Sequence, residues 1–147
     1  MENLVVAGVD GSPESRKAAQ WALAEASARR WPILFATVRP PPQVADPRVE
    51  MAYQHSAWQA AGPLFEELKA DAKALGVSAH CKLLVGQASD VLVKLTAKAG
   101  LSVVGHRDRT GFPSRLGSVA SALAAHAHCP TAVIPAGQYP PSDPPYD

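Results

Sequence analysis

The chain has 147 residues, of which 47% are hydrophobic and 18% charged, and its formal net charge is +1 at pH 7. This length is typical of one globular domain with a substantial core. The near-neutral charge gives no reason to expect a nucleic-acid partner or an acidic membrane surface as a partner. No apolar run is long enough to cross a bilayer, and the first residues do not resemble a signal peptide.

Two cysteines, Cys81 and Cys129, are too few for a disulfide framework or a zinc site. Both are expected to be small buried thiols in a reducing compartment. The sequence therefore predicts a cytoplasmic protein with no membrane partner.

Strand and helix patterns alternate along the first half of the chain. Residues 4–9 are apolar and β-branched, which predicts a buried strand. Ser12 and Pro13 predict a helix with a serine cap that continues to about Arg30. Residues 33–38 predict a second strand, which ends before the prolines that begin at Pro40.

The second half continues the alternation. A long helical segment is expected at residues 49–75, with a break or kink at Gly62-Pro63 and Gly76 as its C-terminal glycine. The remaining elements are a strand at 77–85 exposed on one face, a helix at 89–98, a buried strand at 101–104, a helix from Gly117 that Pro130 ends, and a strand at 131–134.

Five strands interleaved with four helices predict a single doubly wound α/β domain with a parallel sheet. We expect this domain at residues 1–137, followed by a Pro-rich, flexible tail at residues 138–147. Ligands of such sheets bind at the carboxyl ends of the strands. The segments expected there are residues 10–12, residues 38–39 and residues 105–118.

The last of these segments has the form of a phosphate site. A buried strand leads into a loop that contains glycine, and a helix begins at Gly117-Ser118. Free N–H groups in the first turn of a helix, together with the helix dipole, favour an anion.

Both ends of this domain resemble a known family. The opening VVAGVDGSPESRKAAQWALAEA and the closing VVGHRDRTGFPSRLGSVASALAAHAHCPTAVIP are similar to the two signatures of the universal stress protein family. The resemblance covers nearly the whole chain. It implies a Rossmann-like five-stranded parallel sheet of order 3-2-1-4-5 with four flanking helices. It also implies a homodimer joined through the last strand, which runs from Thr131 to Ile134. This strand would lie at a sheet edge.

Many members of this family bind ATP through the pattern G-x2-G-x9-G-[ST], and the resemblance carries this site over by position. The implied ligand is ATP, with or without magnesium. The matching residues are Gly105 as the first glycine, Gly117 and Ser118 as the closing pair with Val119 after them, Asp10 near the adenosine, Val38 with its backbone facing adenine, and Val104 before the loop glycine.

The chain departs from this pattern in two ways. Asp108 stands in place of the second glycine, and only residues 109–116 separate it from Gly117, which is eight residues rather than nine. A carboxylate ~4–6 Å from a phosphate would be repelled by about 3 kcal/mol, which corresponds to roughly a hundredfold in affinity. Three alternatives stay open. The arginines at 107, 109 and 115 offset this charge, or they pair with Asp108 and fill the pocket, or a bound metal ion bridges Asp108 to the phosphates.

Each candidate residue also has a purely structural interpretation. Asp10 could cap the turn before the first helix, and Ser118 could be only the cap of the later helix. His126, His128 and Cys129 look like metal ligands, but residues two apart on a helix point in different directions, and no metal site is expected. His106 either contacts a ligand or is an ordinary loop histidine.

Two functions follow. The first is a stress-response regulatory protein that binds an adenine nucleotide. The second is a dimer that has lost nucleotide binding and acts through protein contacts. No nucleophile elbow, Walker loop or paired zinc ligands occur. An enzyme is therefore not expected, although slow ATP hydrolysis stays open.

Overall fold

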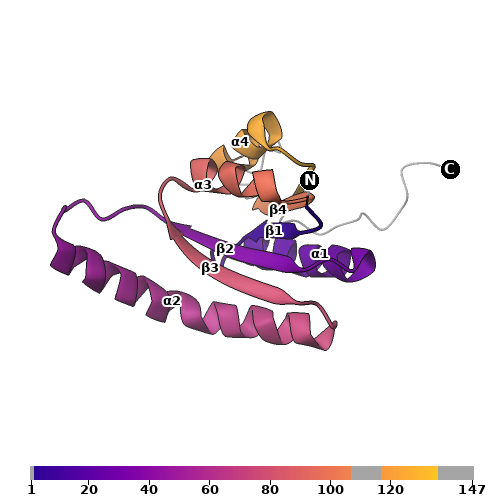
Figure 1. Ribbon diagram of the computed structural model, residues 1–147, viewed down its shortest axis with the longest axis horizontal. Coiled ribbons are helices and arrows are strands. Elements are labelled where there is room, and N and C mark those ends of the chain that lie inside the picture. The colour runs from indigo at the N-terminus through magenta and orange to yellow at the C-terminus, as the bar shows by residue number, and fades with distance from the viewer. Residues whose placement is uncertain (1, 107–116, 136–147) are drawn as a thin grey trace.

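The computed structural model describes residues 2–106 and 117–135. The predicted tail, Asp108 and the three loop arginines lie outside the described residues. The described strands form one parallel sheet of order β3-β2-β1-β4-β5, as expected (Figure 1). Their bounds are β1 Val5–Gly8, β2 Ile33–Arg39, β3 Ala79–Val85, β4 Leu101–His106 and β5 Thr131–Pro135. The helices are α1 Pro13–Arg29, α2 Pro47–Ala74, α3 Ala88–Leu95, the short 3-10 helix η1 Thr96–Lys98 and α4 Ser118–His126.

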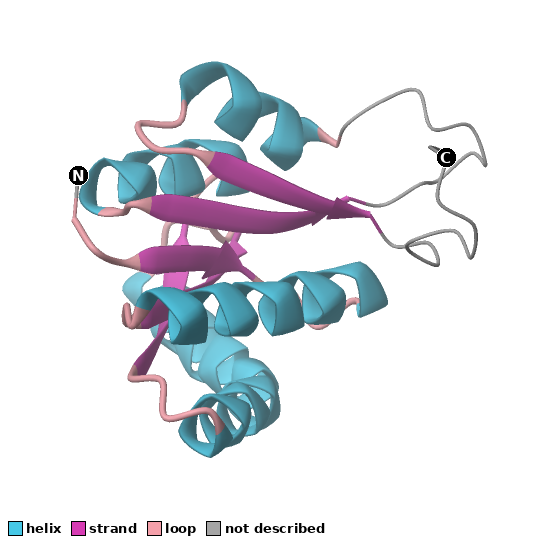
Figure 2. Ribbon diagram, turned by 90° about the vertical axis from the view of Figure 1, so that its right-hand side faces the viewer, coloured by secondary structure: helices cyan, strands magenta, loops and turns pink. Residues whose placement is uncertain are grey.

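The helices cover both faces of the sheet (Figure 2). On one face, α1 and α2 pack against Val5, Phe35 and Val103 in the largest hydrophobic cluster. On the other face, α3 and α4 pack against Ala36 and Val104 in a second cluster. Phe35 is fully buried, and burial of such a side chain contributes about 2–3 kcal/mol. This three-layer arrangement is the predicted doubly wound domain.

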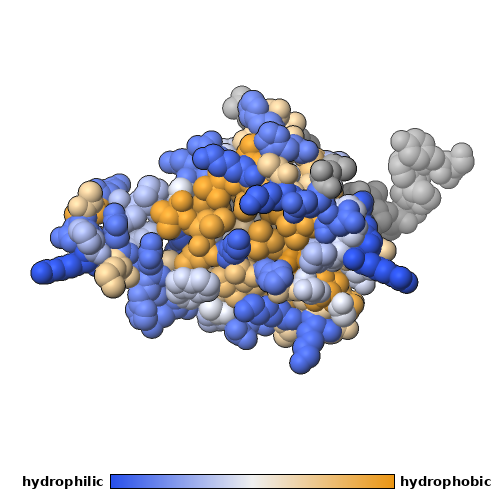
Figure 3. Space-filling model, in the orientation of Figure 1, coloured by the Kyte–Doolittle hydropathy of each residue, from blue (hydrophilic) through white to orange (hydrophobic). Residues whose placement is uncertain are grey.

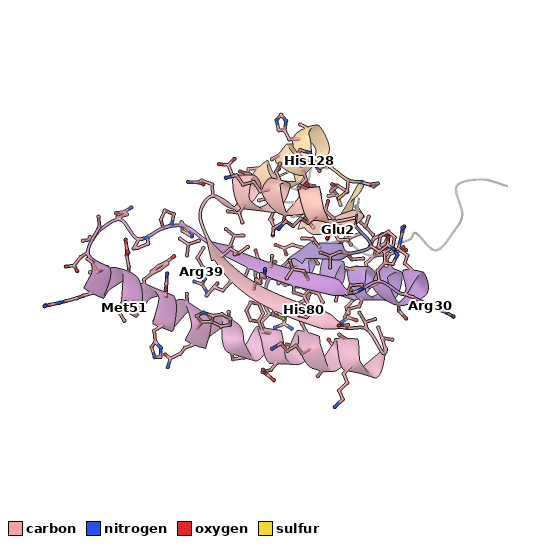
Figure 4. All side chains as sticks on the ribbon, in the orientation of Figure 1. Glu2, Arg30, Arg39, Met51, His80 and His128 are labelled. Atoms are coloured by element: carbon pink, nitrogen blue, oxygen red, sulfur yellow. The ribbon has the colours of Figure 1, made fainter. Side chains whose placement is uncertain are left out.

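The helix α2 runs without interruption through Pro63, so the predicted break at Gly62-Pro63 was wrong. Pro63 is exposed and removes one N–H donor from the helix. Buried residues on both sides of it, Ala57 and Ala61 before and Phe65 after, anchor one continuous helix to the rest of the protein. The first turns of α2 extend past the sheet, where Met51 is 73% exposed (Figures 1 and 4).

Several element boundaries differ from the prediction. The strand β4 continues to His106, so Gly105 and His106 belong to the strand rather than to the loop. The helix α4 ends at His126, before Pro130.

Cys81 and Cys129 are partly buried, whereas the sequence predicted buried thiols.

The edge strand β3 alternates partly buried and exposed residues, as the sequence predicted, with His80 and Lys82 exposed. Hydrophobic residues gather over β2 and β3 on the face of the molecule seen in Figure 3.

Among the described helices, none has the length and apolar character that a membrane span requires.

Candidate functional site

Asp10 lies directly after β1, in the turn that leads into α1. Its Oδ1 accepts a hydrogen bond from the Ser12 N–H at 2.9 Å, and its own N–H donates to the Ser15 hydroxyl at 3.3 Å. Ser12 in turn caps α1, because its hydroxyl accepts the Ser15 N–H at 3.2 Å. Gly11 supplies the left-handed conformation that the turn needs, with φ of 84°. Asp10 thus has the predicted turn-capping contact and remains exposed at the carboxyl edge.

This turn is also tied to α2 through Arg16. The guanidinium bonds the Glu67 carboxylate at 2.6 Å and the Gly11 carbonyl at 3.4 Å. The hydrogen bond from Arg16 lowers the pKa of Glu67 below its usual range. The pair is exposed to solvent, so its role is to link the two helices beside the turn rather than to add much stability.

Val38 lies near the end of β2, where its backbone faces the space beyond β1. Peptide groups of a strand between two parallel neighbours alternate between them. The Arg39 carbonyl accepts from Gly86 on the β3 side, whereas the Ala36 carbonyl accepts from Val9 on the β1 side. The peptide groups of Val38 therefore point toward β1, which ends at Gly8. This agrees with a backbone contact to a ligand at that point.

Gly105 is held against the first turn of α1. A β-carbon at this position would lie 2.7 Å from the carbonyl oxygen of Glu14. The fold itself therefore requires a glycine here. The side chain of Val104 is buried in the second hydrophobic cluster, so it supports the site from the core rather than facing a ligand.

Gly117 differs from Gly105. It is the N-cap of α4, with φ of −63° and ψ of 169°, and a β-carbon added there would meet no described atom within 4 Å. Ser118 is the first helical residue, so the alternative in which Ser118 caps the helix was wrong. Val119 is partly buried against the second cluster.

The first turn of α4 lacks the side-chain caps or acidic residues that occur at the N-termini of the other described α-helices. No side chain caps α4, and its first turn holds no acidic residue. In contrast, α1 and α2 have side-chain caps and acidic first turns, and α3 has Asp90 in its first turn. Among the described α-helices, α4 thus has the N-terminus with the fewest capping or acidic partners from described side chains, and such a helix end suits an anion.

These residues converge on one edge of the sheet. Asp10, Val38 and Gly105 follow or end three adjacent strands, β1, β2 and β4. Gly117 and Ser118 begin α4, which packs on β4. His106, for which the sequence left both a ligand contact and an ordinary loop role open, ends β4 at the same edge. The only sequence signal for it was its position directly after the strand glycine.

One other hollow on the described surface does not form part of this site. An open groove of about 520 Å³ lies beside β3, and its lining includes Leu4, Leu34, His80 and Lys82 but none of the predicted ligand residues. In the ranges 2–106 and 117–135, no group of three or more His, Cys, Asp or Glu side chains is placed to hold a metal ion.

Comparisons with known proteins agree with this architecture. The sequence profile of the universal stress protein family matches residues 1–135. Universal stress protein Rv2623 of Mycobacterium tuberculosis is 30% identical over 138 residues, which cover 88% of this chain and 46% of the relative. The chain spans about half the length of the curated relatives it matches.

Solved structures share the fold. A universal stress protein crystallised in complex with cAMP has a TM-score of 0.73 and 28% identity, covering 90% of this chain and 96% of its own. A family protein from Arabidopsis thaliana with AMP bound has a TM-score of 0.63 and 20% identity, covering 90% and 91%. With the profile match across nearly all of its length, the chain belongs to the universal stress protein family.

Proposed function

We propose that this chain is a stress-response regulatory protein that binds an adenine nucleotide, with ATP as the expected ligand, at the carboxyl edge of its sheet. Gly117 is the observation that carries the proposal. Its backbone conformation is open to any residue, and no atom of residues 2–106 and 117–135 crowds the place of its β-carbon. Close approach of a ligand to the backbone explains a glycine that the fold does not require.

The neighbouring groups suit the parts of a nucleotide. The first-turn N–H groups of α4 and the helix dipole would hold phosphate. The peptide groups of Val38 would face the base, and the Asp10 carboxylate would accept hydrogen bonds from the adenosine. Relatives of the same fold crystallised with cAMP and AMP support an adenine ligand.

The alternative is a dimer that has lost nucleotide binding. In this case the shortened loop and the carboxylate of Asp108 would exclude phosphate. Asp108 lies outside the described residues. The edge strand β5 supports a homodimer under either alternative, because one side of it has no strand neighbour in the described sheet. We propose that the protein acts in the cytoplasm through nucleotide or protein contacts rather than through catalysis.

Isothermal titration of ATP, with and without magnesium, into the wild type and Asp108→Gly separates the two functions. Micromolar binding by the wild type supports the nucleotide-binding function. Binding by Asp108→Gly alone means that the aspartate has switched off a competent site. Absence of binding in both variants favours the dimer without a nucleotide.

A further inference from the structure

His106 carries an unusual buried atom. Its Nδ1 is the one buried side-chain nitrogen or oxygen, among the residues that the structure describes, that has no hydrogen-bond partner. Buried polar atoms are nearly always paired, because an unpaired one loses its bonds to water and gains nothing in return. The ring as a whole is only partly buried. A hydrogen-bond partner for this nitrogen would therefore have to come from outside the described protein atoms.

The position of His106 places its ring at the candidate site. Side chains alternate along a strand, so His106 is on the same face as Val104, which packs against α3 and α4. The register of β1 and β4 pairs Ala7 with Val103. Continued past the end of β1, this register brings Asp10 to the level of His106. The ring thus belongs to the sheet edge and the sheet face where α4 begins.

We propose that His106 is a ligand-binding residue whose Nδ1–H donates a hydrogen bond to a phosphate oxygen of the bound nucleotide. The proposal rests on the proposed nucleotide-binding function and adds a residue that selects nucleotides over nucleosides. Two independent features indicate a phosphate: the unpaired Nδ1, and the positive end of α4, which has no side-chain cap and no acidic first turn. Because protein atoms cover Nδ1, binding of the phosphate includes a turn of the imidazole about its Cβ–Cγ bond.

The test measures the affinities of AMP and adenosine for the wild type, His106→Phe and His106→Asn by isothermal titration. Phenylalanine keeps the ring shape and removes the donor, and asparagine keeps a polar group near the position of Nδ1. His128→Phe is the matched control, because His128 is exposed after the end of α4 (Figure 4).

We expect His106→Phe to lose roughly tenfold or more in AMP affinity, the size of one hydrogen bond to a charged group, with adenosine affinity unchanged. His106→Asn should retain most of the AMP affinity, and His128→Phe should retain all of it. The unfolding midpoint of His106→Phe should equal or exceed that of the wild type, because the unpaired buried nitrogen is gone.

Three results would overturn the role of His106 while leaving nucleotide binding intact. These are equal loss of AMP and adenosine affinity in His106→Phe, no loss of either, or loss of AMP affinity in His106→Asn as large as in His106→Phe. A wild type that binds neither AMP nor ATP would instead overturn the proposed function, and the role of His106 with it.

Discussion

Gly105 in β4 and Glu14 in the first turn of α1 lie so close that a β-carbon on Gly105 would be 2.7 Å from the Glu14 carbonyl oxygen. Backbone cannot move aside as a flexible side chain can. We therefore predict that Gly105→Ala destabilises the fold by about 1–3 kcal/mol, the usual range for overpacking. The free energy of unfolding in urea measures this effect.

The matched control is Gly117→Ala, which places a β-carbon where no described atom lies within 4 Å. Replacing a glycine N-cap by alanine should cost less than about 1 kcal/mol. A Gly105→Ala variant as stable as Gly117→Ala would contradict the close packing of β4 on α1.

Gly117→Ala should affect binding more than stability. If phosphate approaches the backbone of Gly117 and Ser118 closely, a methyl group at Gly117 occupies part of that space. We predict a weaker ATP affinity with a nearly unchanged unfolding free energy. Titration calorimetry beside urea unfolding measures both quantities. Unchanged affinity would mean that ligand does not approach this residue.

The sequence predicted the alternation of elements and the parallel sheet, because apolar runs and glycine or proline turns are local signals. The strand order came from the family resemblance rather than from periodicity. Local signals failed at Pro63, where packing of Phe65 and Ala61 overrides a helix breaker. They also could not explain Gly105, since its contact with Glu14 joins residues far apart in the sequence. The unpaired nitrogen of His106 depends on its buried surroundings, which no short motif specifies.

Pro63→Ala should stabilise the protein, because α2 already continues through this exposed position. Alanine restores an N–H donor and removes the clash of the proline ring with the preceding turn. The helix-interior difference between the two residues is about 3 kcal/mol, of which part is lost because proline also restricts the unfolded chain. We expect a higher thermal midpoint. An unchanged or lower midpoint would show that the helix is shaped around Pro63.

The edge strand β5 allows a specific test of the proposed dimer. The Ser102 N–H donates to the Pro130 carbonyl, so the backbone polar groups of every second residue from Pro130 point toward β4. The backbone N–H and C=O of Val133 therefore point to the side of β5 that has no strand neighbour in the described sheet. Val133→Pro removes an outward N–H and keeps the ladder with β4. We predict that the wild type sediments as a dimer in analytical ultracentrifugation and that Val133→Pro sediments as a folded monomer. A folded Val133→Pro dimer would place the interface elsewhere.

Burial raises the pKa of the Cys81 thiol, with Glu66 adding to the shift and Lys69 opposing it. The thiol form is therefore favoured in the folded state. This contribution to stability is present below the ordinary thiol pKa and is lost as the pH rises through the raised value. In a Cys129→Ser background, alkylation by iodoacetamide should reach half its maximal rate at a higher pH than for a free peptide thiol. A midpoint at or below that of the free thiol would contradict the burial of Cys81.

The most direct test of the account is a titration of ATP, followed in the ¹H–¹⁵N correlation spectrum of the labelled full chain. Binding at the carboxyl edge predicts saturable shifts of the amides of Gly117 and Ser118, of Val38 and of the turn at Gly11. The amides of His80 and Lys82, beside the separate groove at β3, should stay in place. Shifts confined to the β3 groove, or no shifts at millimolar ATP, would contradict a nucleotide site at this edge of the sheet.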